Sequence, residues 1–107
     1  MAAAITDRTR AIIVCSPNNP TGRLIAADLL EKIAQHCESQ RTILLLDECF
    51  IDFTGGISMI SRLKRYPCLL ILRAFTKMYA MAGLRLGYLL ASDSNLLERI
   101  AGFGATW

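Results

Sequence analysis

Four short apolar runs, each bounded by polar or turn-forming residues, constrain what this chain can fold into. The runs are AIIVC at 11–15, TILLL at 42–46, CLLIL at 68–72 and RLGYLLA at 85–91. Most of their residues are apolar at successive rather than alternate positions, which is typical of strands buried on both faces of a sheet. The chain is therefore predicted to contain four strands covered on both sides.

Helical patterns separate these runs. Apolar residues recur three and four positions apart over residues 26–37, the pattern of an amphipathic helix. A short helix is predicted over 58–65, ended by Pro67, and a last helix with Ser92 as its N-cap. Strands alternating with helices predict an α/β fold, a mostly parallel sheet with helices on both faces. The fourth strand follows the third without a full crossover helix, so it is expected to run antiparallel.

Composition narrows the classes of protein. With 107 residues the chain is one domain at most, and 53% hydrophobic against 20% charged residues favours a compact core over disorder. The net charge of +3 comes from scattered Lys and Arg, without the basic run of a nucleic-acid-binding protein. The apolar runs are far shorter than the roughly 20 residues that span a bilayer, so no membrane association is expected. The N-terminus has no signal-peptide pattern, and the four cysteines lack paired spacing, which predicts a cytoplasmic protein with reduced thiols and no metal site.

Polar residues follow three of the predicted strands. They are Asn18 and Asn19 after the first, Asp47 and Glu48 after the second, and Arg73, Thr76 and Lys77 after the third. In parallel sheets ligands bind at the carboxyl ends of the strands, so a site is expected at this edge. Loops are polar in any fold, and this convergence alone does not identify the ligand.

The acidic strand end at 47–48 has two general interpretations that the rest of the sequence disfavours. A nucleotide hydrolase would use it to hold magnesium, but the phosphate loop G-x-x-x-x-G-K-[ST] is absent from the chain. A phosphoacceptor domain would also need an acidic pair after the first strand, where SPNNPTG stands instead.

Three stretches carry a family resemblance. NNPTG at 18–22, DECFIDF at 47–53 and RAFTKMYAMAGLRLGY at 73–88 resemble, in order, three motifs of the fold-type I pyridoxal-phosphate enzymes, in the class I/II aminotransferase branch. Histidinol-phosphate aminotransferases and threonine-phosphate decarboxylases are the members to which the chain is most similar. The resemblance covers residues 11–107 and implies a pyridoxal 5'-phosphate cofactor, a small-molecule amino substrate and a homodimer.

The resemblance also implies a role for each matching residue. Lys77 would form the Schiff base with the cofactor aldehyde and later shuttle a proton at the substrate α-carbon. Asp47 would pair with the pyridine nitrogen, and Asn19 would donate its amide to the phenolic oxygen. Arg85 would bind the cofactor phosphate, with the hydroxyl of Thr76 as an additional contact.

The chain departs from the family pattern at two positions. Phe50 stands where most aminotransferases have a tyrosine, which removes a hydroxyl donor and is similar to the decarboxylase branch. Ala74 stands where a hydroxyl residue usually contacts the phosphate, so one phosphate contact is in doubt. Glu48 is expected to have a structural role, and Asn18 is expected to shape the turn.

Family members are much longer than this chain. Residues 1–107 are therefore expected to form a single partial domain, the central part of the cofactor-binding large domain, with little turnover on its own. The resemblance predicts an aminotransferase acting on an amino acid or a phosphorylated amino compound. A threonine-phosphate decarboxylase-like lyase and a non-catalytic, truncated α/β interaction unit are the alternatives.

Overall fold

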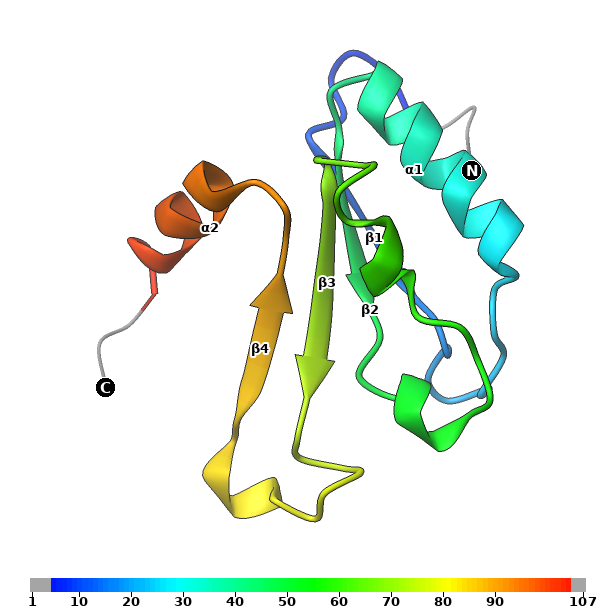
Figure 1. The fold of residues 1–107 in the computed structure, drawn as a ribbon, viewed down its shortest axis with the longest axis vertical. Coiled ribbons are helices and arrows are strands. Elements are labelled where there is room, and N and C mark those ends of the chain that lie inside the picture. Colours follow the sequence, from blue (N-terminus) through cyan, green and yellow to red (C-terminus); the bar gives the residue numbers. More distant parts are fainter. Residues whose placement is uncertain (1–4, 105–107) are drawn as a thin grey trace.

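A four-stranded sheet forms the centre of the protein. The computed structural model describes residues 5–104. Its strands are β1 (Ala11–Cys15), β2 (Ile43–Asp47), β3 (Leu69–Ala74) and β4 (Gly87–Leu90), arranged in the order β1-β2-β3-β4 (Figure 1). β1, β2 and β3 are parallel, whereas β4 pairs antiparallel with β3. The expected strands and the reversal of the last one are confirmed.

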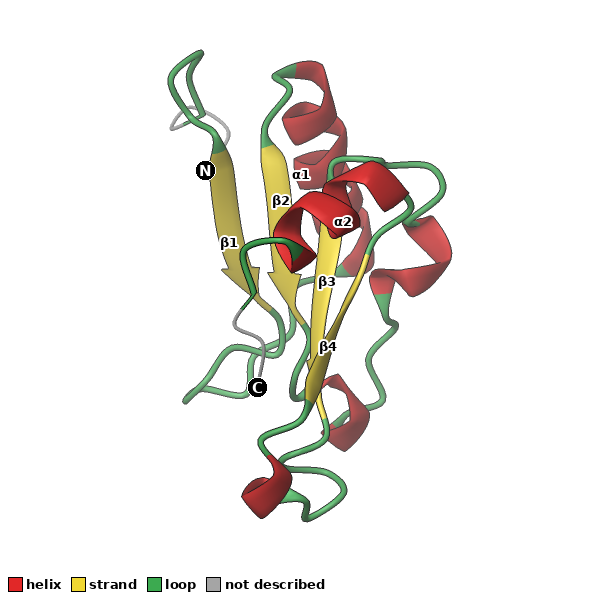
Figure 2. Ribbon diagram, turned by 90° about the vertical axis from the view of Figure 1, so that its left-hand side faces the viewer, coloured by secondary structure: helices red, strands yellow, loops and turns green. Residues whose placement is uncertain are grey.

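Two α-helices lie on opposite faces of this sheet. They are α1 (Ala27–Ser39) and α2 (Ser94–Ala101), and Figure 2 shows α1 behind the sheet and α2 in front of it. The α/β fold class, a mostly parallel sheet with helices on both faces, is confirmed. No helix within residues 5–104 is long and apolar enough to cross a membrane.

The core lies between α1 and the sheet. Leu44 and Leu46 of β2 and Ile71 of β3 are at most 1% exposed, and they share a cluster with Leu30 and Ala34 of α1. Met59, Leu63 and Tyr66 complete this layer from the segment before β3. Burial of the apolar face of α1 is what its helical periodicity predicts.

The opposite face of the sheet is more open than the apolar runs suggest. Ile13 of β1 is 74% exposed, and Leu45 of β2 is only half-buried. Among the described elements, α2 alone lies on this side of the sheet. The prediction that every strand is buried on both faces is therefore wrong for β1.

Two predicted helices differ from the structure, one in its type and length and the other in its N-cap residue. The segment predicted as a helix over 58–65 is a 3-10 turn, η3 (Met59–Arg62), which begins where Ser58 Oγ accepts the Ile60 amide at 3.2 Å. Asp93, not Ser92, caps α2, because its carboxylate accepts the Leu96 amide at 3.1 Å. A negative charge at a helix start is favoured by the helix dipole, which a serine does not exploit. Two further 3-10 turns are η2 (Ile51–Phe53) and η4 (Ala82–Leu84).

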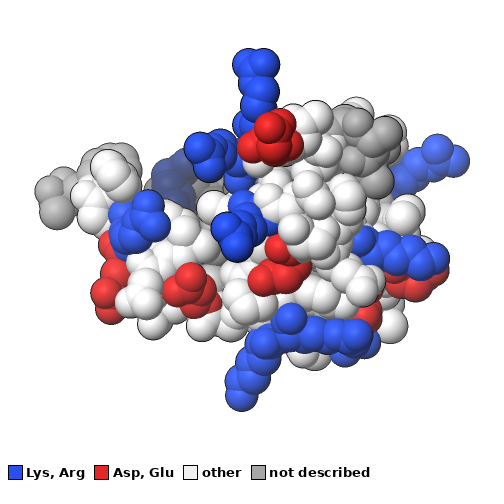
Figure 3. Space-filling view, turned by 90° about the horizontal axis from the view of Figure 1, so that it is seen from above, with Lys and Arg blue, Asp and Glu red and all other residues white. Residues whose placement is uncertain are grey.

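Charged side chains are mixed on the face seen in Figure 3. Lys and Arg project singly there, with Asp and Glu among them, rather than in one basic stripe. This arrangement is typical of a solvated surface. That the protein does not bind nucleic acid remains a prediction.

Candidate functional site

Asp47 lies at the carboxyl edge, in the middle of the sheet. It ends β2, and the strand register places it between Cys15 of β1 and Leu72 of β3. Its Oδ1 accepts the Cys49 amide at 2.9 Å, a tight turn that fixes the carboxylate. The Cys49 thiol is a further hydrogen-bonding neighbour of the same carboxylate. Among residues 5–104, no charged side chain pairs with Asp47.

Lys77 and Asn19 both lie next to Phe50. The Nζ atom of Lys77 is 5.8 Å from the centre of the Phe50 ring, a cation–π distance. Asn19 and Phe50 line the same hollow of about 210 Å³. The side chain of Lys77 is exposed, and among residues 5–104 it makes no hydrogen bond or ion pair.

Thr76 and Arg85 lie in the connection between β3 and β4. Thr76 is half-buried, and Arg85 is exposed with a left-handed backbone (φ 51°) at the end of η4. Over the described part of the chain, no hydrogen bond or ion pair joins either side chain to Asn19, Asp47 or Lys77. Asn19 and Lys77 thus each have Phe50 as a neighbour, and within residues 5–104 no hydrogen bond or ion pair joins any two of the five predicted site residues.

A network of charged side chains that was not predicted from the sequence lies next to this edge of the sheet. The Glu48 carboxylate, 2% exposed, accepts Nη1 of Arg73 at 3.2 Å, Oγ of Ser58 at 2.6 Å and the Met59 amide at 2.8 Å. Nη2 of Arg73 bonds to Asp52. The structural role expected for Glu48 is confirmed. Arg73, counted among the candidate ligand residues, is instead an internal partner of two carboxylates.

One signal in the sequence could have pointed to this network. Arg73 is an arginine inside a strand that otherwise reads LLIL-A, and a cation buried there requires a carboxylate partner. Burial disfavours the charged guanidinium, but hydrogen bonding and attraction from Asp52, with smaller contributions from Tyr88 and Glu48, outweigh it and raise the pKa of Arg73 above its ordinary value. The arginine therefore stays protonated in the fold.

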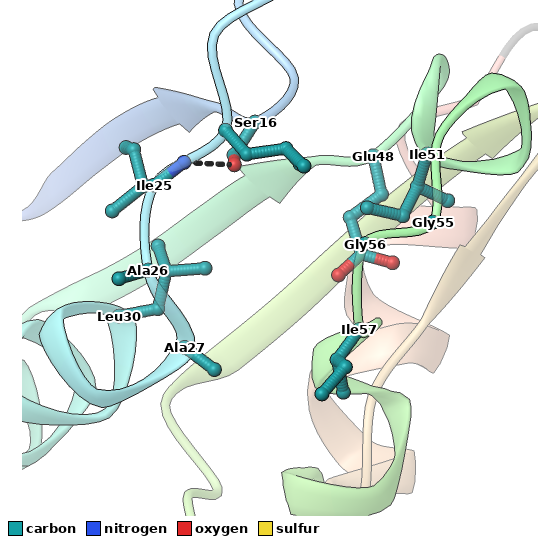
Figure 4. Close-up of a pocket in the computed structure, with 11 residues that line it drawn as sticks. Ser16, Ile25, Ala26, Ala27, Leu30, Glu48, Ile51, Gly55, Gly56 and Ile57 are labelled. Atoms are coloured by element: carbon teal, nitrogen blue, oxygen red, sulfur yellow. Dashed lines mark hydrogen bonds between the residues drawn. The ribbon is translucent and has the colours of Figure 1, made fainter.

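A second hollow lies on the α1 side of the sheet and contains none of the predicted site residues. Figure 4 shows it between the start of α1 and the loop around Gly56, with Ser16 Oγ accepting the Ile25 amide at 3.0 Å. Its walls are mostly apolar, and its volume is about 210 Å³. The Glu48 oxygens on its wall are already bonded to Ser58 and Met59. This hollow therefore contains no side chain to which the sequence assigns a role in cofactor binding.

The thiol beside Asp47 is expected to be unreactive. Burial, followed by the hydrogen bond and negative charge of Asp47, raises the pKa of Cys49 from 9.0 to about 12. At pH 8 the reactive thiolate is then about a thousandfold scarcer than for an unshifted thiol. We expect iodoacetamide to label Cys49 correspondingly more slowly in the folded chain than in urea, measured by peptide mass spectrometry. Equal rates in both conditions would contradict this environment for Cys49.

The fold defines a class first: an α/β unit with a mostly parallel sheet, whose carboxyl edge carries the predicted site residues Asn19, Asp47 and Lys77. The family model described as aminotransferase class I and II matches residues 1–107. The chain belongs to the class I and II aminotransferase family. The family resemblance of its three motifs is thus confirmed.

Individual relatives agree with this assignment. The chain is 43% identical over 93 residues to histidinol-phosphate aminotransferase 2 of Idiomarina loihiensis, covering 85% of this chain and 26% of that protein. It is 44% identical over 105 residues to threonine-phosphate decarboxylase of Salmonella typhimurium, covering 97% of this chain and 29% of the relative. The crystal structure of histidinol-phosphate aminotransferase from Clostridium acetobutylicum superposes with a TM-score of 0.87 at 34% identity, over 94% of this chain and 31% of that one. The chain thus spans between a quarter and a third of the length of these relatives.

Proposed function

We propose that this chain carries the pyridoxal-phosphate attachment site of an aminotransferase that acts on an amino acid or a phosphorylated amino compound, with Lys77 as the attachment residue. The observation that carries the proposal is the position of the Lys77 amine, unpaired among residues 5–104 and 5.8 Å from the Phe50 ring that lines a hollow with Asn19. Enzymes of the family to which the chain belongs are pyridoxal-phosphate dependent. The family match supports the cofactor, and the position of Lys77 within the motif RAFTKMYAMAGLRLGY supports the choice of residue.

The side chains at the carboxyl edge fit this cofactor by their chemistry. A primary amine at Lys77 can bond to an aldehyde, and the Asp47 carboxylate, held by the Cys49 amide, would pair with a protonated ring nitrogen. The amide of Asn19 is exposed beside the hollow and can donate to a phenolic oxygen. Thr76 and the exposed guanidinium of Arg85 supply donors for a phosphate.

These residues divide the work of the reaction. When bound, pyridoxal phosphate supplies the aldehyde that captures an amine and the ring that withdraws electrons from the α-carbon. The Asp47 anion favours a proton on the ring nitrogen, because an opposite charge stabilises the protonated form. The Lys77 amine would move a proton to and from the substrate α-carbon.

A second candidate function is a decarboxylase similar to the threonine-phosphate enzyme. Phe50 favours it, because this side chain cannot donate the hydrogen bond of the tyrosine usual in aminotransferases. The 44% identity to a threonine-phosphate decarboxylase over 105 residues supports it too. The two activities differ in product: the decarboxylase releases carbon dioxide from an amino acid, and the aminotransferase leaves a carbonyl compound.

A homodimer and a cytoplasmic location complete the proposal. Met78, Tyr79, Leu84 and Leu86 are 44–67% exposed in the connection that carries Lys77. Clustered exposed apolar side chains are typical of an interaction surface. Four free cysteines are compatible with a reducing compartment.

Titration with pyridoxal phosphate, followed by the absorbance of the bound aldehyde, tests the cofactor proposal. Lys77→Ala is expected to abolish the specific spectral change, because Lys77 carries the amine that lies beside Phe50, a residue of the hollow. Lys64→Ala is the matched control, since Lys64 is exposed and lies before β3, remote from the carboxyl edge, and it should behave as the unmodified chain. An unchanged titration in Lys77→Ala would favour a non-catalytic interaction unit instead.

A further inference from the structure

The network of Arg73, Glu48 and Asp52 joins the segments that carry the proposed cofactor residues. Glu48 directly follows Asp47, and Arg73 lies four residues before Lys77. Asp52 belongs to η2, which follows Phe50 directly. The guanidinium of Arg73, at the end of β3, therefore connects this strand to the end of β2 through Glu48 and to η2 through Asp52.

The geometry of the network is restrictive. Separate nitrogens of Arg73 bond to the two carboxylates, Nη1 to Glu48 and Nη2 to Asp52. The Arg73 side chain is 10% exposed and that of Glu48 is 2% exposed, so water cannot readily replace this pair, whereas Asp52 is 32% exposed. Glu48 is held on its other side by Ser58 and the Met59 amide. The planar guanidinium of Arg73, hydrogen-bonded through two of its nitrogens, restricts the orientation of β3 more than the flexible ammonium group of a lysine would.

We propose that Arg73 is a positioning residue: its paired hydrogen bonds set the strand end that carries Asp47 against the segment that carries Lys77. Arg73 bonds to Glu48 and Asp52, and it acts through the segments that it joins. This inference rests on the proposed function for its consequence in catalysis. The arrangement itself is a property of the chain alone and can be measured without the cofactor.

Two backbone amides report the arrangement directly. The Cys49 amide donates to Oδ1 of Asp47 at 2.9 Å, and the Phe75 amide donates to the Leu86 carbonyl at 3.1 Å, where the Lys77 segment begins. The Leu44 amide, which donates to the Cys68 carbonyl at 2.9 Å at the far end of the strands, reports the stability of the sheet as a whole. Hydrogen exchange followed by NMR distinguishes local from global loosening by comparing these amides.

The test uses a variant that should still fold. The paired variant E48Q/R73M removes both charges of the buried pair together, which is far less damaging than leaving one of them buried and unpaired. Asp52 loses its arginine in this variant, but at 32% exposure it can be hydrated. We expect protection of the Cys49 and Phe75 amides to fall by about tenfold while that of Leu44 is retained. Arg73→Lys, which keeps the charge and loses the fork, should give an intermediate loss. Arg62→Met is the matched control, because it breaks the more exposed pair with Glu31.

The outcomes separate this inference from the proposed function. Unchanged protection at Cys49 and Phe75 in E48Q/R73M, or an equal loss at Leu44, would overturn the positioning role and leave the network a purely stabilising one. In the presence of pyridoxal phosphate and borohydride, the ratio of labelling at Lys77 to labelling at the other lysines should be about tenfold lower in this variant than in the unmodified chain. If the unmodified chain itself has no such preference, the proposed function fails, and the exchange result still decides the role of Arg73.

Discussion

Glu48→Ala is expected to lower the free energy of unfolding by about 3–5 kcal/mol, the largest effect of any single substitution considered. The change removes one of two carboxylates from an arginine whose side chain is only 10% exposed. It also leaves the Met59 amide and the Ser58 hydroxyl without their acceptor. Urea unfolding monitored by circular dichroism measures the loss.

Glu31→Ala is the control for this prediction. Glu31 also pairs with an arginine, at 2.6 Å from Arg62 Nε, but the two side chains are 25% and 44% exposed. Water can hydrate the arginine left behind, so the loss should be much smaller than for Glu48. Equal losses for the two variants would contradict the view that burial gives the Glu48 network its importance. If Glu48→Ala is too unstable to measure, Glu48→Gln, which keeps an oxygen acceptor, should give a smaller loss in the same direction.

Leu46→Ala is expected to destabilise the chain by about 2–5 kcal/mol. Leu46 is fully buried in the cluster between β2 and α1, and the alanine would leave a cavity that the rigid sheet cannot close. The comparison is Ile13→Ala on the neighbouring strand, where the side chain is 74% exposed. That variant should change stability by no more than about 0.5 kcal/mol. Similar losses for both would mean that the open face of the sheet is as well packed as the α1 face.

Much of the fold follows from periodicity in the sequence. The runs at 11–15, 42–46 and 68–72 could be recognised because buried parallel strands are continuously apolar, and the helix over 26–37 because its apolar residues repeat at helical spacing. The open face at Ile13 could not be predicted, because an apolar run does not say which elements are present to cover it. The cap at Asp93 was missed because Ser92 beside it satisfies the same preference, and only the backbone decides between them.

The candidate site, like the fold, could be predicted only in part from the sequence. Asn19, Asp47 and Lys77 could be singled out because motifs are local in sequence, and strand ends in a parallel sheet share one edge. The contact between Lys77 and Phe50 joins residues far apart in the chain. The pairing of Arg73 with Glu48 spans 25 positions and depends on the register of β2 against β3. No local pattern specifies that register, so the network that we propose to position the site emerges only in three dimensions.

Peptide mapping after borohydride reduction tests the central claim most directly. The chain has three lysines, Lys32, Lys64 and Lys77, and reduction converts a bound aldehyde cofactor into a stable label on whichever amine holds it. With one equivalent of pyridoxal phosphate we predict the label on the peptide that contains Lys77, and its disappearance in Lys77→Ala. A label spread over Lys32, Lys64 and the N-terminus, unchanged by Lys77→Ala, would contradict the assignment of Lys77.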